Sequence, residues 1–164
     1  MVFASHILVG AAIGAKTNNL GLIIILGLIS HFIMDKIPHW DYAVSKNIIS
    51  YKATKKIKYL IIFLLKLSTD LLIGLTIFLI IIFVKSEFLT IKSLIFICVG
   101  ILVSILPDIT LGLNLVLNKT HPNKYSNFHL RYLHYKRKKE GEITFLNFST
   151  QILVMAIAIL LFFS

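Results

Sequence analysis

The sequence is organised around residues 28–42, which read LISHFIMDKIPHWDY. His31 and Asp35 close a long apolar run, and Pro38 stops that run before residues 39–41 add a histidine, a tryptophan and an aspartate. An imidazole and a carboxylate four positions apart lie on one face of a helix, where both can reach the same ion or each other. Ionisable side chains at membrane depth are costly and usually mark function. The stretch therefore predicts part of a functional site, with a purely structural His–Asp pair as the alternative.

The composition is that of an integral membrane protein. Of the 164 residues, 57% are hydrophobic, and the mean hydropathy is +0.88. Four apolar runs approach or exceed the ~20 residues that carry a helix across a bilayer, and a fifth, at residues 2–15, is marginally long enough. Because the runs are continuous rather than alternating, a strand barrel is excluded. We expect one all-α domain over residues 1–164 with about five transmembrane helices. The four longer runs are residues 20–34, 57–84, 91–106 and 145–163.

The lysines and arginines predict how the chain is threaded. Residues 36–58 contain six lysines and residues 109–142 are similarly basic, whereas the other connections carry few cations. Since cations accumulate in cytoplasmic loops, we expect the N-terminus inside and the C-terminus outside. No cation precedes the first apolar run, which favours a mature helix over a cleaved signal peptide. The net charge of +10 lies in these loops without a nucleic-acid-binding motif, so anionic lipid, not nucleic acid, is the expected partner.

Two segments refine this threading. Asp70 lies well inside the run 57–84, but that run is longer than one span needs. We therefore expect its first turns to project into the cytoplasm and to leave Lys66 and Asp70 near the membrane boundary. The alternative is a purely structural salt bridge between these two residues, with no catalytic or metal-binding role. Residues 111–139 interleave aromatic and basic side chains, which predicts an interfacial helical segment before the last span.

In this threading, ionisable side chains from separate parts of the chain fall on one membrane face. Three carboxylates and three or four histidines form a mixed oxygen and nitrogen ligand set, which suits zinc foremost, with manganese or iron as alternatives. The number of carboxylates allows one or two ions. Taken alone, the aspartate that follows Pro107 at the end of the run 91–106 would be ordinary turn chemistry. The metal ligands that we expect are His6, His31, Asp35, Asp70, Asp108 and His134.

The two histidines ahead of the last apolar run are the candidate catalytic residues. His129 and His134 are five positions apart, which on an ideal α-helix turns their side chains about 140° from one another. We therefore expect His134, nearer to the last membrane helix, to be a ligand. His129 would be a further ligand or a proton shuttle. His39 and His121, each next to a proline, are expected to be solvated loop residues.

Short motifs at these positions resemble a known family. The dipeptide Ser5-His6, the block GLISHFIMD at residues 27–35, LPDI at 106–109 and HLRYLH at 129–134 are similar to motifs of the bacterial inner-membrane proteins described as membrane-bound metal-dependent hydrolases. Those proteins are distantly similar to zinc-dependent phospholipase C-type phosphoesterases. The resemblance implies an inner-membrane location, a metal centre and hydrolysis. Residues 110–111 carry no carboxylate where the family has one, and the SH-xxx-D block comes early, so the chain would be a divergent member.

Three functions follow from these features. The leading hypothesis is hydrolysis of a phosphoester, with a membrane lipid headgroup that reaches the site between helices as the expected substrate. The second is an ion-coupled or proton-coupled small transporter that uses the same His and Asp residues as a relay. The third is a non-catalytic membrane scaffold whose metal ties helices together.

Overall fold

The computed structural model describes residues 2–41, 44–85, 90–117, 124–135 and 143–164. Within these ranges every regular element is a helix, as continuous apolar runs predict. In chain order the elements are α1 (Phe3–Lys16), α2 (Leu20–Lys36), α3 (Val44–Thr54), α4 (Ile57–Lys85), α5 (Ile91–Leu117), α6 (Lys124–Phe128), the π-helix η2 (His129–Leu133) and α7 (Phe145–Phe163).

Three helices in the described part of the chain are long and apolar enough to cross a membrane. They are α4, α5 and α7, with 29, 27 and 19 residues. The other two expected spans, α1 and α2, have only 14 and 17 residues. At ~1.5 Å per residue these two helices are shorter than the ~30 Å hydrocarbon layer. The all-α class is therefore confirmed, whereas the count of five spans is not.

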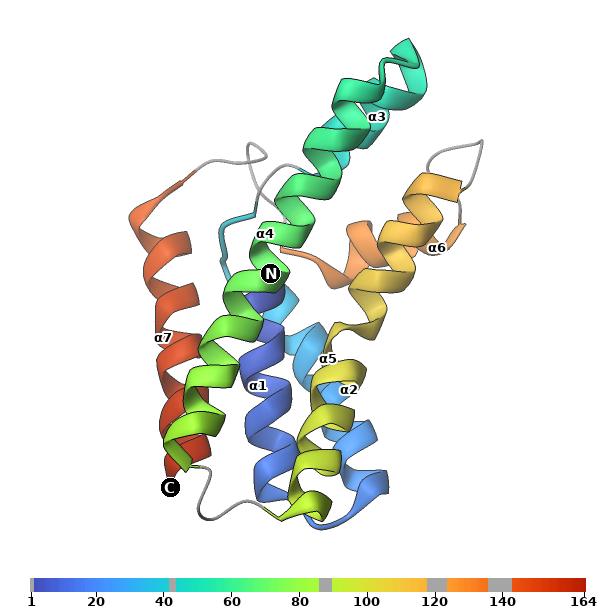
Figure 1. The fold of residues 1–164 in the computed structure, drawn as a ribbon. Coiled ribbons are helices and arrows are strands. Elements are labelled where there is room, and N and C mark those ends of the chain that lie inside the picture. The colour runs from blue at the N-terminus through green and yellow to red at the C-terminus, as the bar shows by residue number, and fades with distance from the viewer. Residues whose placement is uncertain (1, 42–43, 86–89, 118–123, 136–142) are drawn as a thin grey trace.

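Helix α1 lies at the centre of the bundle and contacts α2, α4, α5 and α7 (Figure 1). Its closest approach is to α5, where glycines face each other. A Cβ atom added to Gly100 would lie 2.2 Å from the carbonyl oxygen of Gly10, and one added to Gly10 would lie 2.5 Å from that of Gly100. Small residues allow such backbone contact between membrane helices. This contact brings the start of α1 and the middle of α5 to the same region.

Helix α5 does not end where the sequence suggested. We expected Asp108 at a helix end after Pro107, but α5 continues through this proline to Leu117. A proline removes one backbone hydrogen bond from the helix interior. Side chains tie the following turns together, because Thr110 Oγ1 donates to the Pro107 carbonyl at 2.8 Å and Asn114 Nδ2 donates to the Thr110 carbonyl at 3.0 Å. Asp108 therefore stands on a helix, not in a turn.

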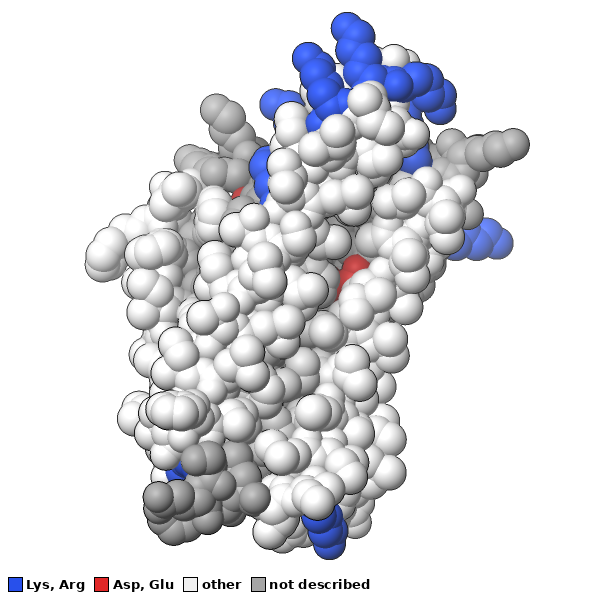
Figure 2. Space-filling view, in the orientation of Figure 1, with Lys and Arg blue, Asp and Glu red and all other residues white. Residues whose placement is uncertain are grey.

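Helix α3 and the first half of α4 form a projection beyond the start of α1 (Figure 1). Its interior is a small cluster of Ile48 and Phe63 with Leu111 and Leu115 of α5. Lysines cover the end of this projection, as Figure 2 shows. The elements α6 and η2 occupy the region expected to hold an interfacial helix, and they contact α5 and α2 respectively. The bundle thus has one strongly basic end.

Candidate metal centre

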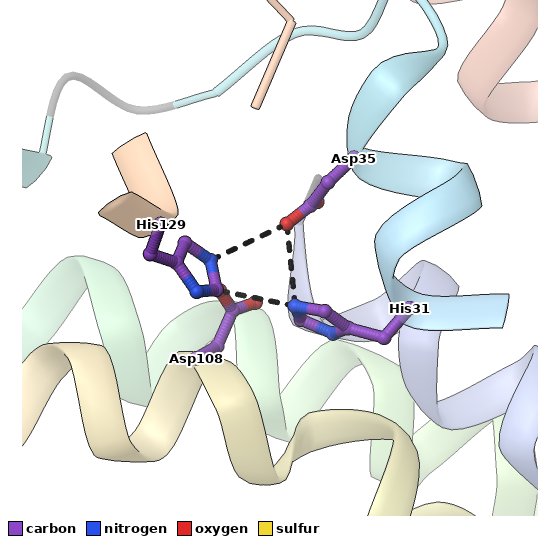
Figure 3. Close-up of side chains that lie close together, drawn as sticks. All are labelled: His31, Asp35, Asp108 and His129. Carbon is purple, nitrogen blue, oxygen red and sulfur yellow. Dashed lines mark ion pairs between the residues drawn. The ribbon is translucent and has the colours of Figure 1, made fainter. Parts of the chain in front are cut away.

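Five of the six expected ligands lie together, in the region where α1, α2 and α5 meet the segment around η2. His6 comes from α1, His31 and Asp35 from α2, Asp108 from α5, and His134 directly follows η2. His129, the first residue of η2, joins these five residues. Figure 3 shows His31, Asp35, Asp108 and His129 pointing toward a common centre from three separate elements.

These four side chains have the spacing of a ligand set, since four of their atoms, one from each, lie within 4.8 Å of one another. The Nε2 atoms of His31 and His129 are 3.2 and 3.7 Å from Oδ2 of Asp35, and both are 3.9 Å from Oδ1 of Asp108. Two ligands of a tetrahedral zinc ion, each bonded at ~2.0–2.2 Å, stand roughly 3.4 Å apart. The observed distances between the nitrogen and oxygen atoms are close to this ligand–ligand distance.

The orientation of His31 is set from outside this ligand set. Its Nδ1 lies 2.7 Å from the carbonyl oxygen of Ser104. Because a carbonyl only accepts, Nδ1 carries the hydrogen, and a neutral ring presents the lone pair of Nε2 to the Asp35 carboxylate. Two electron-rich atoms 3.2 Å apart repel each other in a buried place, unless a proton or a metal ion lies between them. A backbone carbonyl on the far nitrogen is the usual arrangement for a metal-binding histidine.

Four side chains of the centre are buried and two are partly exposed, and these two define what we call its open side. The side chains of His6, His31 and Asp35 are fully buried, and that of His129 is 1% exposed. Asp108 and His134 retain 13% and 11% exposure. A ligand could therefore approach past Asp108 and His134.

His6 faces the opposite oxygens of the same two carboxylates. Its Nε2 lies 3.4 Å from Oδ1 of Asp35 and 3.6 Å from Oδ2 of Asp108. Its ring stacks on that of His31, with the centroids 4.3 Å apart. His6 thus contacts both carboxylates from the side of α1.

The expectation that His129 and His134 point apart is wrong. It assumed an α-helix, but residues His129–Leu133 form a π-helix. A π-helix closes i→i+5 hydrogen bonds and turns less per residue than an α-helix, which brings side chains five positions apart closer to the same side. The two rings are 5.2 Å apart, and His134 Nε2 lies 3.1 Å from Asp35 Oδ2. The amide of Tyr135 also donates to the Asp35 carbonyl at 2.6 Å, which anchors this segment to α2.

Asp70 is not brought into the centre. Its buried carboxylate accepts hydrogen bonds from the backbone amides of Phe3 and Ala4, the latter at 3.3 Å. A helix leaves its first amides without intrahelical partners and carries a partial positive charge there. Asp70 therefore caps the N-terminus of α1, where the sequence suggested a metal ligand.

His39 belongs to the site, although we expected a solvated loop residue. Its side chain is buried, and it forms a second possible ligand set with Asp35 and His134. The sequence feature that indicated His39 as a ligand was its position four residues after Asp35, which continues the spacing of His31 and Asp35. Pro38 concealed this feature by ending the helix in between. His121, the other histidine beside a proline, lies outside the described residues.

No protein-family model, curated protein or solved structure matches this chain.

Proposed function

We propose that this protein is a membrane-embedded, divalent-metal-dependent hydrolase of phosphoesters, a divergent relative of the membrane-bound metal-dependent hydrolases. One observation carries the proposal: residues from α2, α5 and η2, far apart in sequence, form a single set of two imidazoles and two carboxylates, of which only Asp108 is partly exposed. Such a set suits zinc foremost, or manganese or iron. The partial exposure of Asp108 and His134 favours a catalytic centre over a closed structural one.

Some of these residues would bind the metal ion, and others would contact the substrate. A divalent ion in such a site polarises a phosphoryl oxygen and lowers the pKa of a coordinated water. His31, held by the Ser104 carbonyl, and His129 supply nitrogen ligands, and Asp35 and Asp108 supply oxygen ligands. His6 steadies the two carboxylates by contacting their other oxygens. His134 lies on the open side, where substrate enters and product leaves.

A groove on the surface of α2 favours a lipid substrate. It is apolar and open, and Phe32 stands between it and the centre, with its ring 5.3 Å from that of His31 and 6.2 Å from that of His129. An acyl chain would lie in this groove with the phosphate next to Lys36, whose cation complements it. The groove is lined by Ile29, Phe32, Ile33, Lys36, Ile37 and Pro38.

We also infer the membrane and threading of the chain. The three long apolar helices indicate insertion into a membrane. The lysine-covered end of the bundle then belongs in the cytoplasm, with the N-terminus inside and the C-terminus outside the inner membrane.

The test measures metal content and lipid hydrolysis on the full chain purified in detergent. The wild type, after zinc or manganese is added back, should retain metal and release phosphate or a phosphorylated headgroup from phospholipid micelles. His31→Ala and Asp35→Asn should lose both properties. Asp41→Asn is a matched control, because this aspartate is near His39 in sequence but belongs to neither ligand set. A wild type that holds no metal would refute the proposal, and one that holds metal without hydrolysis would favour the scaffold.

A further inference from the structure

Two ligand sets lie side by side and share one carboxylate. The first is His31, Asp35, Asp108 and His129, and the second is Asp35 with His39 and His134. In the second set too, one atom of each residue lies within 4.8 Å of the others. The three residues come from the end of α2, the segment after Pro38 and the position directly after η2.

The ring of His39 is oriented as a metal ligand requires. Its Nδ1 lies 2.7 Å from the carbonyl oxygen of Ile37, so that nitrogen carries the hydrogen and Nε2 keeps its lone pair. The side chain is fully buried, although it follows a proline at the end of a helix. A solvated loop residue would have neither feature.

His134 is placed against Asp35 by backbone contacts as well as by its ring. Its Nε2 lies 3.1 Å from Asp35 Oδ2, and the centroids of His39 and His134 are 5.8 Å apart. The next residue, Tyr135, donates its amide to the Asp35 carbonyl, and Thr150 of α7 donates its hydroxyl to the Pro38 carbonyl. The two histidines of the second set are therefore each held near the end of α2 by a hydrogen bond of the neighbouring residue.

We propose that Asp35 bridges two divalent ions, one held by His31, Asp108 and His129 and the other by His39 and His134. This inference rests on the metal centre of the proposed function and adds a second ion to it. Paired ions in phosphoesterases stand ~3.5–4 Å apart and clamp the attacking and leaving oxygens of one phosphoryl group. With three protein ligands, the second position keeps a coordination site open, which is the arrangement of catalytic ions.

The substrate class follows from the location of this second ion. His134 of the second set and Asp108 of the first are 11% and 13% exposed, so both positions face the open side of the centre. The open coordination site is thus the one that an incoming phosphoester meets. A phosphate mono- or diester, whose oxygens bind two cations at once, is the ligand that this geometry fits.

The competing assignment makes His39 and His134 a proton relay to a single ion. It differs in the number of ions that the protein binds and in their magnetic coupling. Manganese(II) distinguishes the two assignments, because ions that share a carboxylate show an exchange-coupled electron paramagnetic resonance spectrum, whereas an isolated ion gives a simple six-line signal. The experiment is a manganese titration of the metal-depleted full chain in detergent, followed by equilibrium dialysis and by these spectra.

The wild type should bind two manganese ions per chain and give the coupled spectrum. His39→Ala, and independently the shape-conserving His39→Gln, should bind one ion and give the six-line signal, while Asp41→Asn should behave as the wild type. Saturation of the wild type at one ion, two ions without coupling, or a coupled pair in both His39 variants would overturn the inference. Lipid hydrolysis is measured separately. Two coupled ions without hydrolysis would remove only the proposed function, and hydrolysis with one ion would remove only the second site.

Discussion

The Nδ1 of His31 donates a hydrogen bond to the carbonyl oxygen of Ser104, at a distance of 2.7 Å and among buried atoms. This contact joins α2 to α5 one turn before Asp108, and it selects the tautomer in which Nε2 of His31 faces Asp35. Helix packing and metal chemistry are therefore coupled through one imidazole. A displacement of α5 along α2 would change both the position of Asp108 and the orientation of His31.

The first prediction concerns the affinity of the centre. His31→Ala removes a ligand from the first set, so it should weaken zinc binding by more than the ~10–100-fold that loss of an outer hydrogen-bond partner causes. Competition with a chromophoric chelator measures the change. Asp41→Asn, in the same region of the chain but outside both sets, should leave the affinity unchanged. Equal affinities for the wild type and His31→Ala would remove His31 from the ligand set.

The second prediction separates Asp70 from the metal ligands. Asp70→Ala leaves the first amides of α1 without their buried acceptor, so the free energy of unfolding should fall by about 1–2 kcal/mol. Thermal unfolding in detergent measures this loss. Because Asp70 caps a helix, the number of ions bound per chain should stay that of the wild type. Loss of an ion from a variant that is still folded would show that Asp70 is a metal ligand.

The third prediction tests the contact between α1 and α5. Gly100→Ala places a methyl group 2.2 Å from the carbonyl oxygen of Gly10, so the helices must separate, at a cost of about 1–3 kcal/mol. Gly112→Ala, in the same helix, is the matched control, because nothing lies within 4 Å of the added atom. That change should be neutral or slightly stabilising, since alanine is the better helix former. Equal unfolding temperatures for the two variants would contradict the close packing described above.

The fourth prediction concerns the groove beside the centre. Lys36→Ala removes the cation that would meet a lipid phosphate, while the two ligand sets stay intact. We expect a higher KM for anionic phospholipid, with kcat and metal content close to those of the wild type. Lys16→Ala, at the other end of the bundle, is the control. If both variants show the same kinetics as the wild type, the phosphate does not bind next to Lys36.

The fifth prediction concerns threading, and in particular whether the short helices α1 and α2 cross the membrane. In a Cys98→Ala background, a cysteine at Asn18 should react with a membrane-impermeant reagent added from outside the cell, and a reporter after Ser164 should also be outside. A cysteine at Lys46, in the basic projection, should react only after lysis. Labelling of position 18 only after lysis would mean that α1 and α2 do not form a transmembrane pair.

The sequence alone determined the features that depend on neighbours along the chain. Continuous apolar runs predict helices, because a buried helix satisfies its own backbone hydrogen bonds. The spacing of His31 and Asp35 predicts a shared face, because the helical repeat is a local property. Both predictions agree with the structure. Local rules failed where an ideal α-helix was assumed for residues that form a π-helix, and where Pro107 was expected to end a helix that continues to Leu117.

Only the tertiary structure decided which ionisable residues meet. His6 and Asp108 join the pair on α2 because glycine contacts set how closely and at what height α1 and α5 pack, and His129 joins it from η2. The same packing places Asp70 at the end of α1, and the hydrogen bond from Tyr135 to Asp35 holds the end of η2 over His39. Relative height and rotation of helices are set by contacts between distant residues. The sequence identifies the candidate residues of a site, and the packing of the helices determines which of them come together.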